Sequence, residues 1–158
     1  VYRRYGRDVY GEVLRLFSAM PYAAVVEEHG IFAVHGGIAR MLRSISQIEG
    51  IRKGITEPYN ESQLALEILW NDPSEEAEWF SPSVRGESIY VFGYKAYKRF
   101  AEANGVKLMV RSHEVFQEGY HWYFGGKVLS IFSARNYGIP IEAKYAAVED
   151  GEVDLLPV

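Results

Sequence analysis

The sequence predicts a mixed α/β fold of the α+β kind, in which helices alternate with strands before an antiparallel set of strands ends the chain. Apolar residues recur at helical spacing over residues 7–20, 60–70 and 93–105. Two glycine-containing turns, at 125–126 and 150–151, each separate a pair of strand-like runs. These observations together favour helices and strands in one folded unit.

The first predicted helix covers residues 7–20. Its apolar residues lie near helical spacing: Val9, Val13, Leu14, Leu16 and Phe17. Pro21 limits its continuation. The following run, "AAVVEEHGIFAVHGG", predicts two strands, 23–28 and 31–35, which meet at the His-Gly pair between them.

The middle of the chain predicts two helices and a loop. Residues 44–47, Ser-Ile-Ser-Gln, match a capping box at the start of a short helix. A further helix covers 60–70, with Asn60 or Ser62 as its N-terminal cap. Residues 71–88 are rich in Pro, Ser, Glu and Gly and predict a long surface loop, a kind of segment that is usually functional or disordered.

The last part of the chain predicts one helix and then strands. The helix 93–105 ends at Asn104-Gly105, a good C-terminal stop, and a short buried strand follows at 106–110. The remaining strands flank the two glycine turns and are expected at 119–124, 127–133, 143–149 and 152–158.

Length and composition exclude several classes of protein. The chain has 158 residues, of which 48% are apolar, so we expect a single domain spanning residues 1–158 with a substantial core. It has no run of eighteen apolar residues, and its start lacks a secretory signal, so we expect a cytoplasmic protein that does not enter a membrane. The net charge is −4 without a basic stripe, which argues against nucleic acid as a partner.

The absence of cysteine restricts the chemistry of any site. Disulfides, thiolate metal sites and cysteine nucleophiles are excluded. A metal ion would have to bind to histidine, carboxylate, amide or water ligands, a set that favours Mn, Fe or Zn.

Polar residues follow three predicted strands, at the points where the strands end. The run "IFAVHGG" places His35 before two glycines, and "LMVRSHE" places Arg111 and His113. The run "VLSIFSARNYG" places Asn136 and Tyr137. Strand ends are rigid places from which to present reactive groups, and neighbouring glycines let a ligand approach the backbone.

Each of these residues also has a purely structural interpretation. A histidine after a strand is more often a hydrogen-bonded structural residue than a ligand. Arg111 could pair with a nearby carboxylate, and Tyr137 could belong to the core. Arg85, in "VRGESIYVFG", suits a two-pronged contact to phosphate, but a lone loop arginine is more often solvated. The combination of several such strand ends in one short chain favours a site.

An ordered set of motifs resembles the C-terminal half of the PPP-type serine/threonine phosphoprotein phosphatases, which are calcineurin-like metallophosphoesterases. The motifs are "IFAVHGGI", "ILWNDP", "VRGESIYVFG", "VRSHEVFQEGY" and "LSIFSARNYG", and the resemblance covers roughly residues 2–150. It implies the C-terminal part of a four-layer calcineurin-like β-sandwich, which would be incomplete here.

The resemblance implies roles for five residues. His35 and His113 fall on metal-ligand positions of the family, and Arg85 falls on the arginine that holds the phosphoryl oxygens. Tyr137 falls on a tyrosine that lines the phosphate site, and Asp72 on a group at the edge of the site.

Four other residues receive minor roles or none. Arg111 would support His113, and Asn136 would support the phosphate site. His29 and His121 match no family ligand, so we expect a turn residue at His29 and a sheet residue at His121.

For a complete domain the resemblance implies two divalent metal ions, Mn, Fe or Zn, and a phosphoserine or phosphothreonine protein as substrate. The ions would activate water for attack on phosphorus, with Arg85 neutralising the phosphoryl oxygens.

The chain departs from the family pattern in its first half. The motifs "GDxHG", "GDxVDRG" and "GNHE", which supply carboxylates and further ligands, are absent, and no Gly-Asp dipeptide occurs. Two histidines and one arginine do not make a dinuclear site. We therefore expect this chain alone to be inactive or nearly so. Either it is part of a longer polypeptide with a missing N-terminal segment, or a partner chain supplies the rest.

Smaller departures affect the rim of the site. Arg135 stands where the family often has Pro, and Gly138 where it often has Cys. Arg135 would add positive charge near the phosphate, which favours acidic substrates or only alters the rim.

Two competing functions remain. The first is a dinucleoside-polyphosphate hydrolase of the same superfamily, although "VRSHE…GY" with "SARNYG" favours the protein phosphatase type. The second is a non-catalytic half-domain that pairs with a partner, which the missing carboxylates favour for the chain as it stands.

Overall fold

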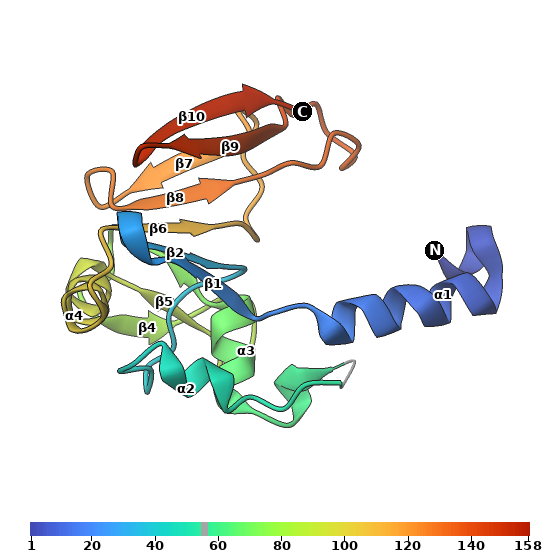
Figure 1. Cartoon of the computed structure of the whole chain (residues 1–158), viewed down its shortest axis with the longest axis horizontal. Helices are drawn as coiled ribbons and strands as arrows, with labels where there is room; N and C mark the ends of the chain where they lie inside the picture. Colours follow the sequence, from blue (N-terminus) through green and yellow to red (C-terminus); the bar gives the residue numbers. More distant parts are fainter. Residues whose placement is uncertain (55–56) are drawn as a thin grey trace.

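A computed structural model describes residues 1–54 and 57–158 and confirms the mixed α/β prediction (Figure 1). The α-helices are α1 (Tyr2–Ala19), α2 (Ser46–Glu49), α3 (Gln63–Trp70) and α4 (Tyr94–Asn104), and the 3₁₀ helices are η1 (Glu27–His29) and η2 (Pro58–Asn60). The strands are β1 (Ala23–Val26), β2 (Ile31–Val34), β3 (Asp72–Pro73), β4 (Phe80–Pro82), β5 (Tyr90–Phe92), β6 (Leu108–Arg111), β7 (Tyr120–Tyr123), β8 (Val128–Ile131), β9 (Lys144–Glu149) and β10 (Glu152–Pro157).

Within those two ranges the strands form a five-stranded sheet, a three-stranded sheet and a hairpin. The main sheet has the order β1-β2-β6-β8-β7, the small sheet the order β3-β5-β4, and β9 pairs with β10. Strands β2, β6 and β8 are parallel, whereas β1 and β7 run antiparallel to their neighbours. The carboxyl ends of β2, β6 and β8 therefore meet at one edge of the main sheet.

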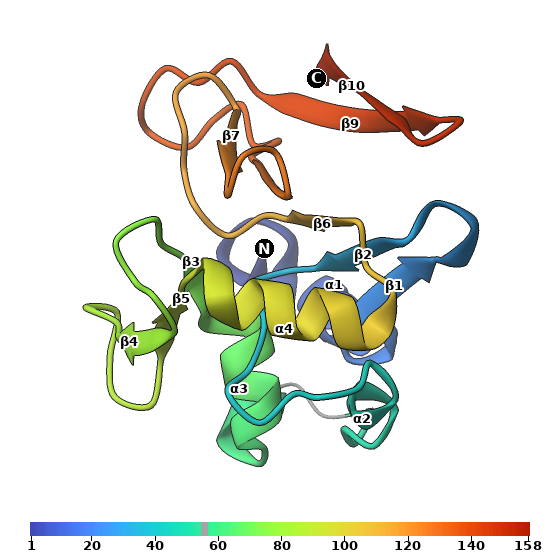
Figure 2. The same ribbon diagram turned by 90° about the vertical axis from the view of Figure 1, so that its left-hand side faces the viewer.

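Helix packing buries one face of the main sheet. Phe32, Met109 and Val128 are neighbours across β2, β6 and β8, and all three are fully buried. Tyr97 and Phe100 from α4 join the same core, and the Phe32 and Phe100 ring centroids lie 5.1 Å apart. Helices α3 and α4 lie on the same side of β2 and β6 (Figure 2). Apolar burial on this face is the main stabilising contribution.

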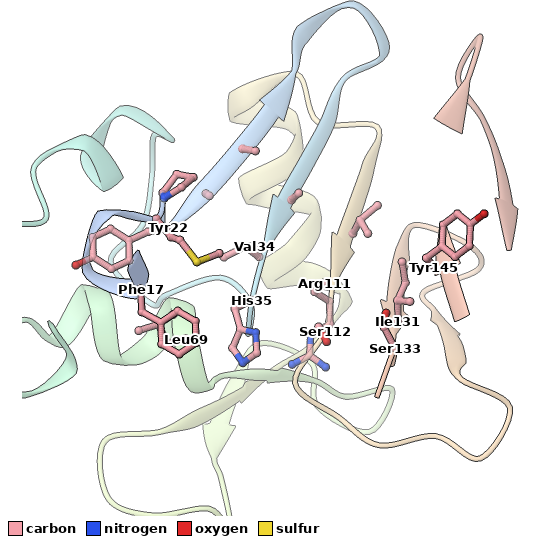
Figure 3. Close-up of a pocket in the computed structure, with 16 residues that line it drawn as sticks. Phe17, Tyr22, Val34, His35, Leu69, Arg111, Ser112, Ile131, Ser133 and Tyr145 are labelled. Carbon is pink, nitrogen blue, oxygen red and sulfur yellow. The ribbon is translucent and has the colours of Figure 1, made fainter. Parts of the chain in front are cut away.

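The opposite face of the main sheet is hollowed. Ala33, Val110 and Ile131 are partly exposed and line a groove of about 870 Å³. Phe17 of α1 and Tyr145 of β9 lie at its two sides (Figure 3). We call this hollow the sheet-face groove.

Helix α1 extends away from the sheets (Figure 1), and in the described part of the chain none of its residues is buried. It begins earlier than predicted, at Tyr2, but Gly6 breaks the helical conformation with φ 85° and ψ 178°. It ends at Ala19, before an extended Met20 and Pro21, as expected. No helix among the described residues is long and apolar enough to cross a membrane.

Side-chain and glycine caps set the helix ends where the sequence predicted them. The Ser62 hydroxyl, not Asn60, caps α3 by accepting a hydrogen bond from the Ala65 N–H at 3.2 Å. Gly105 ends α4 in the left-handed conformation, with φ 67°.

The capping box before α2 is partly formed. The Gln47 side chain accepts from the Ser44 N–H at 2.9 Å, but the Ser44 hydroxyl accepts from the Ser46 N–H at 3.3 Å, one residue earlier than the motif requires. The helix is correspondingly short.

The prediction of a long surface loop over 71–88 is correct only in part. This segment contains β3 and β4, which both pair with β5 in the small sheet. Strands of two or three residues have too few positions to show an alternating pattern, so only the pairing in the folded chain defines them.

Two strand predictions need correction in detail. The strand expected at 23–28 ends at Val26, because the 3₁₀ helix η1 takes the next three residues. The turn at 125–126 lies in a longer loop, because the last pair of that hairpin is Tyr123 with Val128. The turn at Asp150-Gly151 is a two-residue turn as predicted, with φ of 51° and 83°.

Substituting the two glycines that flank α4 should have different costs. A Cβ on Gly93 would lie 1.7 Å from the Ala77 carbonyl oxygen, so the backbone must move. A Cβ on Gly105 would contact nothing within 4 Å, so its only cost is the strain of a left-handed backbone. We expect Gly93→Ala to lower the free energy of unfolding by about 2 kcal/mol or more and Gly105→Ala by about 1 kcal/mol. Urea unfolding followed by circular dichroism measures both, and an equal or inverted cost would contradict the packing described.

Candidate functional site

Two of the predicted site residues meet at the carboxyl edge of the main sheet. His35 follows β2 directly and His113 lies two residues beyond β6, and His35 Nε2 is 3.2 Å from His113 Nδ1. The Ser112 N–H donates to the His35 carbonyl at 3.0 Å, which continues the β2–β6 pairing to the histidines. The Trp70 ring packs edge-on against His113, with centroids 5.2 Å apart. The parallel strands therefore hold both imidazoles at one place.

The two glycines after His35 are required for close packing. A Cβ on Gly36 would lie 2.5 Å from the Leu69 carbonyl carbon, and one on Gly37 would lie 2.2 Å from the Phe92 ring. Both glycine N–H groups donate to the Ile68 carbonyl, at 2.9 and 3.2 Å. The loop after His35 thus lies directly on the end of α3, where a side chain cannot fit.

His113 has a left-handed backbone conformation, with φ 79°. For a residue with a Cβ this conformation costs on the order of 1 kcal/mol. Such strain persists only where the surroundings impose it, and it is common at functional sites. The His113 ring lies edge-on to the His35 ring, with centroids 5.0 Å apart. Figure 3 shows His35 beside Arg111 and Ser112.

Arg111 is the buried centre of the site, with a side chain that is 0% exposed. Its Nε donates to the Gly36 carbonyl at 2.5 Å, and its Nη2 donates to Asp72 Oδ1 at 2.7 Å. Its Nη1 donates to Glu114 at 2.5 Å and to the Ser130 hydroxyl at 3.1 Å. One guanidinium thus joins the ends of β6 and β8, the loop after β2, and β3.

Asp72 binds two arginines at once. Its second carboxylate oxygen accepts from the Nε of Arg85, whose side chain is one-third exposed. Among the described residues the Arg85 Nη atoms have no hydrogen-bond partner. Asp72 therefore orients Arg85 and leaves the outer end of its guanidinium available to an anion.

The surroundings lower the pKa of both imidazoles, which favours their neutral form. Burial lowers the pKa of His113 to about 4. The charge of Asp72 opposes this shift, whereas the charges of Arg85 and Arg111 add to it. Burial, then Arg111, lowers the pKa of His35 as well. Neutral imidazole is the form that binds metal ions, so the pair is prepared for a ligand role near neutral pH.

The distance between the two facing histidine nitrogens fits a hydrogen bond between the rings and also fits two ligands of one ion. Metal–nitrogen bonds of about 2.1 Å place two adjacent ligand nitrogens roughly 3.0 to 3.4 Å apart, and the observed distance is 3.2 Å. His113 Nε2 is buried and has no hydrogen-bond partner among the described residues. Over the same residues no cluster of three or more His, Asp or Glu side chains is placed to hold a metal ion.

The structure does not bring every predicted residue to the histidines. Tyr137 is 60% exposed, and its ring packs edge-on against Phe132 with centroids 5.1 Å apart. Asn136 is exposed too, and across the described residues no hydrogen bond links either side chain to Asp72 or His113. Arg135 lines a separate hollow near the C-terminus.

The two other histidines lie outside the site. His121 is exposed on β7, on the face opposite Tyr120, and stacks on Phe116 with ring centroids 5.2 Å apart. His29 ends η1 before the left-handed Gly30, as expected of a turn residue.

The sequence interpretation missed Glu114, Ser130 and Tyr123. Glu114 accepts from Arg111 and from the Tyr123 hydroxyl, the latter at 3.1 Å, and burial raises its pKa. Ser130 is the register partner of Arg111 across β6 and β8. The position of Glu114 three residues after Arg111 was a usable signal, whereas the contacts of Ser130 and Tyr123 depend on strand pairing.

Comparisons with known proteins agree on one family. The calcineurin-like phosphoesterase family model matches residues 1–117. The chain is 35% identical over 136 residues to the serine/threonine-protein phosphatase BSL2 of Arabidopsis thaliana, an alignment that covers 85% of this chain and 13% of that protein. A solved protein serine/threonine phosphatase from Saccharomyces cerevisiae, described as similar to human phosphatase PP5, superposes with a TM-score of 0.74 at 28% identity. That superposition covers 86% of this chain and 41% of the yeast chain.

Removing the buried guanidinium should unfold the site. We expect Arg111→Met to lower the free energy of unfolding by about 3 to 5 kcal/mol, because it leaves buried carboxylates without their partner. The matched control is Arg52→Met, which breaks an exposed ion pair with Glu61 and should cost less than about 1 kcal/mol. Urea unfolding of both variants measures the difference. Equal costs would show that the Arg111 network is not a main support of the fold.

Proposed function

The chain belongs to the calcineurin-like phosphoesterase family, and we propose that it forms part of a metal-dependent serine/threonine protein phosphatase. The reaction would be hydrolysis of a phosphoserine or phosphothreonine monoester in a protein substrate. The observation that carries this proposal is the meeting of His35 and His113 at 3.2 Å, next to the Asp72–Arg85 ion pair. Two imidazole nitrogens and a partly exposed guanidinium thus lie at one edge of the sheet, and this supports the proposal.

His35 and His113 would hold a divalent ion in this enzyme. Their neutral state and their spacing support this assignment. When bound, a pair of divalent ions supplies charge neutralisation and lowers the pKa of a bound water. Mn, Fe and Zn all accept imidazole with carboxylate ligands.

Arg85 would bind the phosphoryl oxygens. Its Nε is held by Asp72, so the remaining N–H groups can donate two parallel hydrogen bonds to a phosphate. Charge developing on the phosphoryl group in the transition state strengthens these bonds. Asp72 itself would act by orienting Arg85 rather than by contacting the substrate.

The family resemblance assigns Tyr137 to the phosphate side of the site, and Asn136 is a supporting residue beside it. Tyr137 lies beyond β8, the third parallel strand whose end reaches this edge, and its exposed ring is accessible to a substrate. The assignment requires residues 133–139 to lie against the bound phosphoprotein.

The ligands that the described residues lack would come from a further polypeptide segment, in the same chain or in a partner. The sheet-face groove supports this proposal, because His35 and Ser112 lie on its lining together with apolar residues. A segment that covered the groove would bury apolar surface and reach the histidines. The chain on its own is then expected to have little or no activity.

A non-catalytic role is the second candidate. The absence of a group of three metal-binding side chains among the described residues favours a half-domain that only pairs with a partner. Tight binding of Mn²⁺ through His35 and His113 would contradict this role, and isothermal titration with the two His→Ala variants measures it.

A substrate comparison tests the proposed reaction against a dinucleoside-polyphosphate hydrolase. The natural protein that contains this chain is assayed with Mn²⁺ on a phosphothreonine peptide and on diadenosine tetraphosphate. We expect a higher kcat/KM for the phosphopeptide, with release of inorganic phosphate. Preference for the nucleotide would refute the protein phosphatase assignment.

Substitutions at the site should separate its members from the other histidines. In the same natural protein, His113→Ala should abolish turnover and weaken Mn²⁺ binding, whereas Arg85→Ala should lower kcat/KM by about 10²- to 10³-fold with metal content unchanged. The control is His121→Ala, an exposed sheet residue that should leave both properties intact. Retained turnover in His113→Ala would overturn the ligand assignment.

A further inference from the structure

The loop that carries Arg85 has little internal support. Val84 is completely exposed, and Ser88 has a left-handed backbone with φ 61°. The loop is closed by a backbone hydrogen bond from Ser83 N–H to the Ile89 carbonyl at 2.9 Å. Of the two apolar side chains of the loop, Val84 and Ile89, only Ile89 is buried. Contacts with neighbouring elements, the Arg85–Asp72 ion pair among them, therefore contribute to its order.

Three polar contacts fix the end of this loop to the rest of the chain. The Tyr90 N–H donates to Asn71 Oδ1 at 2.8 Å, and Gln63 Nε2 donates to the Ser88 carbonyl at 2.9 Å. The Arg40 guanidinium lies 3.6 Å from the centroid of the Tyr90 ring. The three anchoring side chains come from two different segments.

The three anchors converge on the buried carboxylate of Glu67, which is 2% exposed. Glu67 accepts from the Arg40 N–H at 2.6 Å, from Arg40 Nε at 3.1 Å and from Gln63 Nε2 at 2.9 Å. Asn71 Nδ2 lies 3.5 Å from the same carboxylate. A charge buried this deeply is tolerated only with such a full set of donors, so the anchors and Glu67 depend on one another.

The same carboxylate also holds the loop that follows His35. Arg40, which donates to the Glu67 carboxylate, belongs to that loop. Asn71 Nδ2 also donates to the Ile38 carbonyl of the loop at 2.9 Å. Glu67 therefore connects residues 38–40, which follow the metal-ligand candidate, with residues 88–90, which follow the phosphate-binding candidate.

We propose that Glu67 is a positioning residue that orders the 83–89 loop and thereby fixes Arg85 relative to His35. The part that concerns phosphate rests on the proposed function of Arg85, whereas the ordering of the loop does not. An arginine fixed in advance loses less conformational freedom when it binds an oxyanion, so its affinity for phosphate is higher than that of a mobile one.

Limited proteolysis of the chain tests the ordering directly. Trypsin cleaves after arginine, and the bond between Arg85 and Gly86 becomes accessible when the loop opens, so cleavage reports the population of the open loop. We expect Glu67→Gln to increase the rate of cleavage at Arg85 by about tenfold or more, through loss of charge-assisted hydrogen bonds. Mass spectrometry of native-state digests measures the rate at each arginine.

Two internal controls separate positioning from general destabilisation. Cleavage after Arg135, in another exposed segment, should stay at the wild-type rate in Glu67→Gln. Glu61→Gln, which removes an exposed charge just before α3, should change neither rate. If cleavage at both arginines rises equally, or if neither rises, the proposal is refuted.

A second variant keeps the test decisive if Glu67→Gln does not fold. Gln63→Ala removes the Ser88 contact from an exposed position and leaves the Arg40 and Asn71 contacts of Glu67 in place. We expect a selective rise at Arg85 of about two- to fivefold, because the variant loses the hydrogen bonds of Gln63 to Ser88 and to Glu67 but keeps the other contacts of Glu67. An unchanged rate of cleavage at Arg85 in Gln63→Ala would refute the proposal that this network orders the loop.

Digestion in the presence of inorganic phosphate tests separately whether Arg85 binds phosphate. In the wild-type chain, phosphate bound to Arg85 should slow cleavage at Arg85, and Glu67→Gln should need a severalfold higher phosphate concentration for the same protection. Protection at equal concentrations in both proteins would refute positioning. Absence of protection together with selective loop opening would count against the phosphate role of Arg85 and support the ordering by Glu67.

Discussion

The structure depends on the burial of one guanidinium. A completely buried arginine must have partners for its donors, and Arg111 has four: a backbone carbonyl, two carboxylates and a hydroxyl. These partners come from the loop after β2, from β3, from β8 and from the segment after β6. Because a missing partner would cost several kcal/mol, the position of Arg111 determines where these segments lie relative to one another. The edge that carries both histidines is organised around this residue.

A second polar network extends this support to the phosphate-binding candidate. Asp72 shares its carboxylate between Arg111 and Arg85, and it follows Asn71, which belongs to the network around Glu67. The last turn of α3 and the residues after it thus carry two buried carboxylates, Glu67 and Asp72. The interior of the chain combines an apolar core under the main sheet with a chain of paired charges at the sheet edge. The apolar core contributes most of the stability, and the charges set the geometry of the site.

The sequence interpretation was accurate where local chemistry decides the structure. The cap at Ser62, the stop at Gly105 and the turn at Asp150-Gly151 each depend on a side chain or backbone preference within a few residues. It failed for β3 and β4 within 71–88, which are too short to show a pattern and are defined by their pairing with β5. It could not identify Glu67, since a single Glu on an amphipathic helix looks like any solvated charge.

We could predict from local residue patterns the helices, the turn at Asp150-Gly151, the order of the motifs and the polar residues at the ends of three strands, because these features depend on neighbouring residues. The contact between His35 and His113 at 3.2 Å and the exposure of Tyr137 depend instead on how distant segments pack together. Parallel pairing of β2 with β6 is a long-range choice, and it places two side chains 78 residues apart in contact. Packing likewise sets the partners of buried charges. A buried charge needs an opposite charge beside it, but the sequence does not show which residue will be that partner.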